Sequence, residues 1–376
     1  MFYYISFLRP PPTATVLGAP VAFTPQVSND LRTENFPGSV DIFYHWIDST
    51  TGSQLSSAVK LTTWREANAY KELTVAPPPL RKPGQATLVL TSSQASGARE
   101  IDLRSLKYGK EPLPVYSTPI VFGARSAGKA RKQEAVERRF RLFDSDDGGS
   151  LQVREMTSFD LDKKLWDSGV GLSGWLVRLS AEPTSNLHLK EALWDAVATE
   201  TELRVVELGA GTGVVSLVLA AVRNTLYPNA PTKILSTDLP SSIELMDYNV
   251  SGNASLYPIH PPHPIVLDWD DDGIPREVAD MECIDIIMAA DITYNTASYP
   301  SLVGTLSRLL AHSPEAIFLL AYKQRDLTER ELWSMVSEHV SITLQKVDDV
   351  VGAGGQAVEI WIGKRASQNA HPALQS

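Results

Sequence analysis

Short apolar runs alternate with helical patterns along the second half of the chain. The runs begin near residues 203, 233, 264, 283 and 316, and each has the length of a strand. Between them, apolar residues recur at the spacing of helices over residues 214–222, 241–250, 299–311 and 327–339. Two further runs at residues 341–346 and 358–363 predict closing strands. This alternation predicts an α/β domain with a seven-strand, Rossmann-like sheet.

The first 150 residues have a different pattern, which predicts a mostly β accessory region. Segments at residues 1–8, 41–47 and 87–91 are rich in β-forming residues, and turn-rich segments separate them. Near residues 124–143, basic side chains interleaved with acidic ones predict a basic helix, with either a solvated face or a contact surface for a partner. We therefore expect an accessory region over residues 1–150, an α/β domain over residues 151–366 and a disordered tail over residues 367–376.

An acidic segment at residues 144–155 has two interpretations. Asp144, Asp146 and Glu155 stand at ligand positions of a calcium-binding loop. Gly148, however, occupies a position where a further oxygen ligand is needed, and no second loop of this kind follows. We favour a turn that leads into a strand over residues 151–156, and we predict no metal site.

Charge and cysteine content narrow the expected partners. The formal net charge is -10 and the pI is about 5.3, which argues against nucleic acid and is compatible with a basic protein substrate. Cys283 is the only cysteine, so no internal disulfide can form, and we expect a cytoplasmic or also nuclear protein. The apolar residues 1–8 are too few to span a membrane, so no membrane partner is expected. Nothing in the sequence indicates the oligomeric state.

A glycine-rich turn joins the strand at residues 203–208 to the helix that begins at Val214. The turn follows Glu207 and reads Gly-Ala-Gly-Thr-Gly over residues 209–213, so backbone can approach a ligand and helix N–H groups are exposed to it. A dinucleotide fingerprint needs a glycine where Val214 stands, and a P-loop needs a Gly-Lys-Ser/Thr sequence, which does not follow. Gly-x-Ser-x-Gly and His-Glu-x-x-His motifs are also absent from the sequence. The turn therefore disfavours a nicotinamide-dependent oxidoreductase.

Acidic and aromatic residues follow the next three predicted strands. Asp238 ends the second strand, where a carboxylate either accepts ribose hydroxyls or caps the following helix. Asp268 and Trp269 end the third strand and suit an adenine ring, although Trp269 can equally belong to the core. Asp291 and Tyr294 follow the fourth strand, where they either receive an ammonium group or serve as a cap and a packed ring. Because such strand ends share one crevice, we expect these residues to surround a common site.

Five ordered motifs together resemble those of the seven-strand protein lysine methyltransferases defined by an Asp-x-x-Tyr motif, methyltransferase family 16. They are Leu-Trp-Asp-Ser at residues 165–168, Val-Glu-Leu-Gly-Ala-Gly-Thr-Gly at 206–213, Thr-Asp-Leu-Pro at 237–240, Leu-Asp-Trp at 267–269 and Ala-Asp-Ile-Thr-Tyr at 290–294. Tyr-Lys-Gln-Arg at residues 322–325 and Val-Glu-Ile-Trp at 358–361 are also similar to the family. The resemblance covers about residues 150–365 and implies a class I methyltransferase fold.

The resemblance implies S-adenosylmethionine as the cofactor and a lysine side chain of a protein as the methyl acceptor. Family targets include translation elongation factors and chaperones. The implied catalytic residues are Asp291 and Tyr294, which would frame the target lysine. The expected cofactor-binding residues are Trp166, Glu207, Gly209, Gly211, Gly213, Asp238, Asp268, Trp269 and Ala290.

Two features depart from the family pattern and leave the substrate open. The first 120 or so residues exceed the family's short leading segment, and Asn295 follows the Tyr at a position where family members vary. One alternative function is methylation of a small amine. Another is a cofactor-binding scaffold without turnover, which the intact glycines, Asp238 and Asp291 disfavour.

Overall fold

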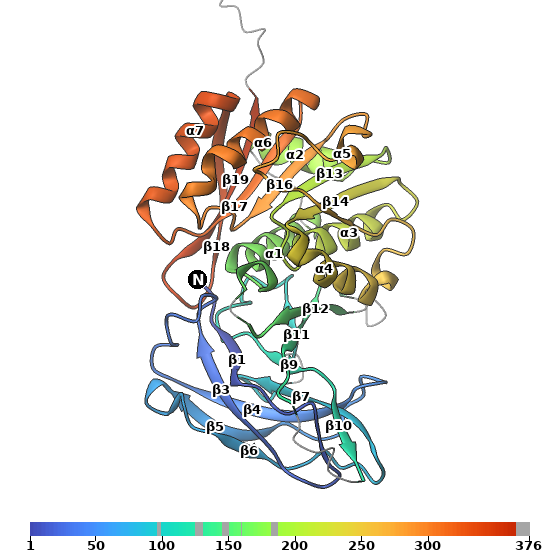
Figure 1. Cartoon of the computed structure of the whole chain (residues 1–376), viewed down its shortest axis with the longest axis vertical. Helices are drawn as coiled ribbons and strands as arrows, with labels where there is room; N and C mark the ends of the chain where they lie inside the picture. Colours follow the sequence, from blue (N-terminus) through green and yellow to red (C-terminus); the bar gives the residue numbers. More distant parts are fainter. Residues whose placement is uncertain (96–98, 125–130, 145–149, 159, 182–186, 366–376) are drawn as a thin grey trace, which may run out of the picture. The chain divides into compact units, whose positions relative to one another are not determined.

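The computed structural model describes residues 1–95, 99–124, 131–144, 150–158, 160–181 and 187–365. They form two compact units (Figure 1). The first holds residues 1–167, 251–253 and 351–357, and the second holds residues 168–250, 254–350 and those from 358 on. The first unit thus extends beyond the expected boundary at residue 150, because the strand that follows this position pairs within its sheet. The expected tail over residues 367–376 lies outside the described residues.

The first unit is built almost wholly of strands, as the accessory region was predicted to be. Three of them form an antiparallel sheet: β1 (Tyr4–Arg9), β3 (Val21–Ser28) and β6 (Leu73–Val75). The other strands form a larger sheet: β2 (Ala14–Val16), β4 (Ser39–Asp48), β5 (Val59–Arg65), β7 (Gly84–Thr91), β8 (Ile101–Asp102), β9 (Val115–Ser117), β10 (Ile120–Gly123), β11 (Ala135–Arg141) and β12 (Ser150–Met156). Two single turns of 3-10 helix, η1 (Glu66–Asn68) and η3 (Leu161–Lys163), complete this unit among the described residues.

Aromatic side chains fill the core of the first unit. Trp46 on β4 packs edge-on against Phe122 on β10, with ring centroids 5.6 Å apart. The Trp46 indole N–H donates to the carbonyl of Ala76 at 2.8 Å, so the buried ring keeps its polar atom satisfied. This unit therefore has a hydrophobic core of its own.

The basic helix expected near residues 124–143 is wrong. Strand β11 occupies Ala135–Arg141 and pairs antiparallel with β12 over seven residues, from Ala135↔Met156 to Arg141↔Ser150. Residues 125–130 lie outside the described residues. The sequence of β11 does not alternate between apolar and charged residues as a half-buried strand usually does. The reason is that Arg138 lies on the buried face together with Val136 and Phe140.

The expected strand after the acidic segment is confirmed as β12. The segment itself, in which a calcium loop was weighed against a turn, falls largely on residues 145–149, outside the described residues. No group of three or more His, Cys, Asp or Glu side chains is arranged to hold a metal ion among the residues described.

The second unit contains the predicted seven-strand sheet. Its strand order is β15-β14-β13-β16-β17-β19-β18. Strands β13 to β17 pair in parallel with their neighbours, whereas β19 runs antiparallel to β17. The bounds are β13 (Leu203–Leu208), β14 (Thr232–Asp238), β15 (His263–Val266), β16 (Ile286–Ala290), β17 (Ile317–Tyr322), β18 (Ile342–Val351) and β19 (Ala357–Arg365). The Rossmann-like prediction is confirmed.

Helices cover both faces of this sheet (Figure 1). On one face, Ile287 of β16 shares a core with Leu306 of α6 and Val336 of α7. On the other face, Glu207 of β13 accepts hydrogen bonds from Ser216 of α3. The helices are α1 (Asp167–Ala181), α2 (His188–Val197), α3 (Val214–Leu226), α4 (Pro240–Gly252), α5 (Arg276–Ala279), α6 (Tyr299–His312) and α7 (Glu331–Val340), with 3-10 turns η4 (Ala254–Leu256), η5 (Thr296–Ser298) and η6 (Leu327–Arg330). None of the described helices is both long and apolar enough to cross a bilayer.

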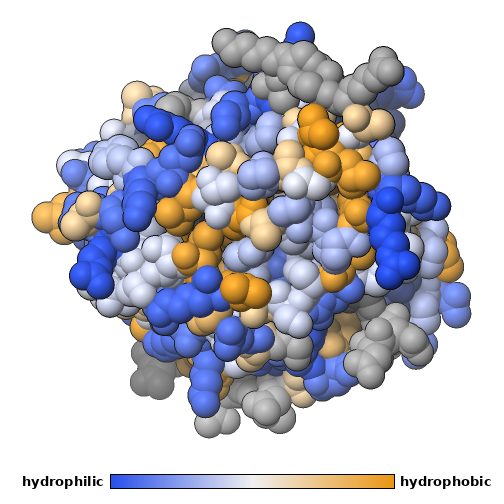
Figure 2. Space-filling model, turned by 90° about the horizontal axis from the view of Figure 1, so that it is seen from below, coloured by the Kyte–Doolittle hydropathy of each residue, from blue (hydrophilic) through white to orange (hydrophobic). Residues whose placement is uncertain are grey.

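Exposed apolar side chains are spread over the surface. Figure 2 shows one face of the molecule, on which hydrophobic areas are divided by hydrophilic residues. Single exposed apolar residues of this kind are normal for folded proteins.

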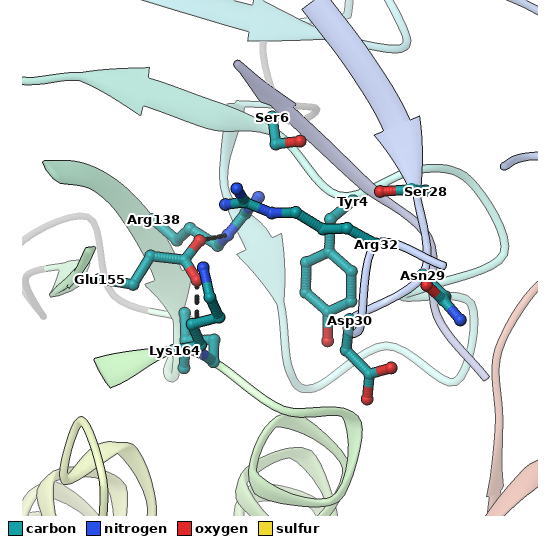
Figure 3. A pocket seen from close by; sticks show the side chains of 10 residues that line it. Tyr4, Ser6, Ser28, Asn29, Asp30, Arg32, Arg138, Glu155 and Lys164 are labelled. Atoms are coloured by element: carbon teal, nitrogen blue, oxygen red, sulfur yellow. Dashed lines mark hydrogen bonds and ion pairs between the residues drawn. The ribbon is translucent and has the colours of Figure 1, made fainter. Parts of the chain in front are cut away.

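Buried charges stabilise the interior of the first unit (Figure 3). The Arg138 guanidinium lies 2.8 Å from the Glu155 carboxylate and donates to the carbonyls of Pro114 and Ile5 at 2.6 and 3.2 Å. Burial raises the pKa of the Glu155 carboxyl, but nearby cations, with Arg138 first among them, outweigh burial and hold the pKa below its usual range. The cavity beside this pair has a volume of about 10 Å³, which is room for about one water molecule. It is too small for a cofactor.

Removing only one partner of this pair should strongly destabilise the first unit. Arg138→Met takes from the buried Glu155 carboxylate the cation that lies 2.8 Å from it and leaves only Arg32 and Lys164 nearby, so the free energy of unfolding should fall by about 3–5 kcal/mol. Replacing both residues, as Arg138→Met with Glu155→Leu, should cost less, because the carboxylate is removed together with its closest cation. Denaturant unfolding of the full chain measures both.

An exposed ion pair supplies the control. Lys60 and Asp41 lie 2.7 Å apart with side chains 50% and 40% exposed, so Lys60→Met should cost only about 0–1 kcal/mol. Equal losses for the single and double variants of the buried pair would contradict the prediction.

Candidate functional site

The glycine-rich turn lies where β13 ends, and it is closely covered. Gly209 has φ +62°, a left-handed conformation that favours glycine. A Cβ at this position would lie 2.9 Å from Cγ2 of Ile292 and 3.5 Å from Cζ2 of Trp269. Residues after β15 and β16 therefore approach the turn so closely that no side chain fits there.

Asp238 links the end of β14 to this turn. Its Oδ2 accepts from the N–H of Gly211 at 2.7 Å, and its Oδ1 accepts from the N–H of Leu239 at 2.7 Å. Strands β13 and β14 pair in parallel, with Leu208 opposite Thr237, so Asp238 and Gly209 stand side by side. The structure thus brings together two residues that the sequence placed at a common site.

Glu207 points away from the strand end toward α3. Its Oε2 accepts from the N–H of Ser216 at 3.2 Å and from the Ser216 hydroxyl. Burial raises the pKa of the Glu207 carboxyl to about 8, despite these hydrogen bonds. This side chain braces the first turn of α3 beneath the glycines.

Asp268 and Trp269 lie beyond the third strand, because β15 ends at Val266. Asp268 is half-buried, and its Oδ1 accepts from the N–H of Asp270 at 3.0 Å. The Trp269 ring packs both against the core and over Gly209. Trp269 therefore packs against the core, as one of its two alternatives expects, and its contact with an adenine ring stays a prediction.

Asp291 directly follows Ala290, the last residue of β16, and its carboxylate is buried. Arg325 Nη1 lies 2.6 Å from Oδ1 and Nη2 lies 3.1 Å from Oδ2, which is a bidentate pair. The N–H of Ser168, near the start of α1, donates to Oδ2 at 2.9 Å. Burial raises the pKa of the Asp291 carboxyl, but the charge and hydrogen bonds of Arg325 outweigh it and lower the pKa below its usual range. Asp291 is therefore ionised at neutral pH.

Tyr294 differs from Asp291 in being on the surface. Its side chain is 56% exposed, whereas Thr293 beside it is buried. The Tyr299 hydroxyl donates to the carbonyl of Thr293 at 2.9 Å and fixes the segment. The motif thus places a buried charge and an exposed ring three residues apart.

Trp166 belongs to the first unit, unlike the other residues expected at the cofactor site. It is half-buried, and its indole N–H donates to the carbonyl of Leu161 at 2.9 Å. Its expected contact with the cofactor stays a prediction.

The pairing of Arg325 with Asp291 is not predicted by the sequence. The motif at residues 322–325 is only similar to the family, and Arg325 and Asp291 are 34 residues apart in the chain. The other late motif, at residues 358–361, is structural. Its Trp361 ring packs on Trp333 at 5.2 Å and on the Arg330 guanidinium at 5.3 Å.

A larger cavity of about 310 Å³ lies elsewhere in the second unit. Its lining includes Cys283, Asp285 and Ile317, at or before the first residues of β16 and β17. Ligands of open α/β sheets bind at the opposite, carboxyl ends of the strands. The glycine turn, Asp238, Trp269 and Asp291 all lie at the carboxyl ends, so we take those residues as the candidate site.

Comparison with protein families identifies the family of this chain. Residues 145–339, more than half of the chain, match the model of a family described as lysine methyltransferase. The chain belongs to this family. It is a methyltransferase whose methyl donor is S-adenosylmethionine.

Three relatives show the range of similarity. This chain is 29% identical to EEF1A lysine methyltransferase 3 of Xenopus tropicalis. The match covers 46% of this chain and 75% of that protein. It is 28% and 25% identical to the Saccharomyces cerevisiae protein-lysine N-methyltransferases EFM2 and EFM6. These matches cover 54% and 48% of this chain, and 47% and 70% of the relatives. The chain therefore spans about half the length of EFM2.

The residues of the second unit fit this methyl donor. Gly209 leaves backbone uncovered by a side chain of its own, and Asp238 offers a carboxylate at the end of the neighbouring strand. A sulfonium donor is already activated, so the protein needs to position it and exclude water. A glycine turn with one carboxylate suits that task better than a nucleophilic triad.

Substitution of Gly209 tests how tightly the turn is packed. Gly209→Ala should lower the free energy of unfolding by more than the ~1–2 kcal/mol of a left-handed alanine, because Ile292 must also shift. Gly52, with φ +70° and nothing within 4 Å of an added Cβ, is the matched control. Gly52→Ala should show the conformational cost alone. Equal changes in thermal midpoint for the two variants would mean that Ile292 does not crowd the turn.

Proposed function

We propose that this methyltransferase transfers the methyl group of S-adenosylmethionine to a lysine side chain of a protein, and that the lysine enters at Asp291 and Tyr294. The observation that carries this proposal is a buried, ion-paired carboxylate and an exposed aromatic ring three residues apart, just after the strand beside the glycine turn. A lysine has a charged tip and an apolar stem, so a carboxylate and an aromatic wall suit its two parts.

The reaction is an in-line displacement. The donor supplies an electrophilic methyl group on a positively charged sulfur. The lysine nitrogen must first lose a proton to solvent, and its lone pair then forms the N–C bond while the C–S bond breaks and its electrons go to sulfur. Asp291 would orient the amine through an N–H group, and Tyr294 would exclude water from it. No covalent enzyme intermediate is required.

The donor would lie along the strand ends. In our proposal the backbone at Gly209, Gly211 and Gly213 faces its methionine part, with Glu207 bracing the turn and Ala290 opposite. Asp238 would accept the ribose hydroxyls. The adenine ring would lie between Trp269 and the Asp268 carboxylate, which would accept its amino group.

A translation elongation factor is the first substrate class to test. The Xenopus tropicalis relative is named as a lysine methyltransferase of EEF1A, and a net charge of -10 suits a basic protein surface. Chaperones are the second class. Both are met in the cytoplasm, the location we propose for the reaction, with the nucleus as a second compartment.

Cofactor binding should depend on Asp238. Asp238→Ala should weaken S-adenosylmethionine binding by about 1.5–3 kcal/mol, the scale of hydrogen bonds to a charged group. NAD should not bind, because Val214 replaces the third glycine of its fingerprint. Isothermal titration calorimetry measures both. Asp247→Ala, at an exposed acid on α4, is the control and should bind like the wild type. Binding of NAD without binding of the methyl donor would refute the assignment.

Asp291 should serve the acceptor and not the donor. Asp291→Ala should abolish methylation while the Kd for S-adenosylmethionine stays within about tenfold, or 1.4 kcal/mol. Labelled donor with purified elongation factor 1A, and with a lysate, measures transfer; calorimetry on the same folded variant measures donor binding. Tyr294→Phe should retain more activity than Tyr294→Ala, because the ring remains.

Four results would change the assignment. Near wild-type turnover of Asp291→Ala would exclude the acceptor role, and a collapse of donor binding would move Asp291 to the cofactor site. Label found only in small amines would favour the small-molecule alternative. Donor binding without any transfer would favour the scaffold.

A further inference from the structure

The Asp291 carboxylate is not a bare charge. Both of its oxygens accept from protein donors: Arg325 reaches Oδ1 at 2.6 Å and Oδ2 at 3.1 Å, and Ser168 N–H reaches Oδ2 at 2.9 Å. The guanidinium thus places one positive charge against the one negative charge. An amine that approaches this pair meets a dipole of little net charge.

The buried charged groups around the Asp291–Arg325 pair also balance one another. The N–H of Arg325 donates to Oε2 of Glu329 at 2.9 Å, and Glu329 and Lys323 are both buried. Lys323 interacts electrostatically with Asp291. The formal charges of these four side chains, two acidic and two basic, sum to zero. Tyr299 faces the same segment as a neutral phenol that donates to the carbonyls of Thr293 and Glu329.

Arg325 lies on the accessible side of the pair. Its side chain is 12% exposed, whereas that of Asp291 is 2% exposed. The backbone of Asp291 is fixed in a left-handed conformation, with φ +59°, and its N–H donates to the carbonyl of Ala321 at 3.1 Å. A group that comes near the buried carboxylate therefore also comes near the guanidinium paired with it, which is the more exposed of the two.

We propose that Arg325 is a positioning residue that keeps the acceptor site electrically neutral, so that the incoming lysine loses its proton. This inference rests on the proposed lysine transfer. A bare carboxylate within 4–6 Å favours the charged form and would raise the pKa of the lysine by about 1–3 units. Only the neutral amine has a lone pair for the methyl group. Arg325 removes this opposing effect while leaving the carboxylate in place as an acceptor.

The pH dependence of transfer tests this role. The single-turnover rate at saturating donor and protein substrate reports the lysine in the bound complex. Arg325→Gln leaves one net negative charge. The acid limb of the profile, which is the pH below which the rate falls, should therefore move to higher pH by about 1 unit or more. Below the limb the rate should fall about tenfold for each unit, and it should approach the wild-type rate at high pH. Arg325→Lys keeps the charge and should keep the limb.

A variant of opposite sign gives an independent measurement. Glu329→Gln retains an oxygen that can accept from the N–H of Arg325 but leaves one net positive charge, so the limb should move to lower pH. Arg276→Gln, at a guanidinium 89% exposed in the same unit, removes a remote charge and should leave the limb unchanged. If Arg325→Gln does not fold, as judged by circular dichroism, Glu329→Gln and Arg325→Lys decide the question.

The outcomes separate this inference from the proposed function. A uniform loss of rate at every pH, with the limb unmoved, would make Arg325 purely structural. A lower KM for the protein substrate with an unmoved limb would mean that the lysine displaces Arg325, which also overturns the inference. A wild-type protein that binds the methyl donor and methylates no lysine would overturn the proposed function itself.

Discussion

Parallel pairing of the central strands is the constraint on which the candidate site depends. Strand β13 pairs on one side with β14, where Leu208 lies opposite Thr237, and on the other with β16, where Leu208 lies opposite Ala289. The residues that follow these positions are therefore neighbours at the carboxyl ends of these three strands. Chemistry that is spread over more than 80 residues of sequence is gathered by backbone hydrogen bonds alone. Side-chain contacts such as Asp238 to Gly211 then fix the details.

Much of the second unit could be predicted because its signals are local. Apolar runs, a glycine turn and acids at strand ends depend on a few adjacent residues, and each of the seven strands and the helix after the turn was found where expected. The pairing of Asp291 with Arg325 could not be predicted, because no local pattern says which cation meets a buried acid. The raised pKa of the Glu207 carboxyl could not be predicted either. It follows from burial against α3, which only the folded sheet creates.

The first unit shows where pattern reasoning fails. A strand with an inward-facing arginine does not alternate between apolar and polar residues, so β11 looked like a charged helix. Its inward Arg138 has partners that the local sequence does not reveal: Glu155, on the paired strand and 17 residues away, lies 2.8 Å from the guanidinium, which also donates to the carbonyls of Pro114 and Ile5. Removing one partner of such a buried pair costs more than its formation contributes, because the other charge stays buried.

The position of β19 has a consequence for how the second unit forms during synthesis. This strand, the last one among the described residues, lies between β17 and β18, which both precede it in the sequence. While the ribosome is still making residues 357–365, β18 has no neighbour and one edge of β17 is open. Such an edge can pair with other chains. This sheet is therefore completed only after its six other strands have been made, and until then the edge of β17 that β19 will cover stays open.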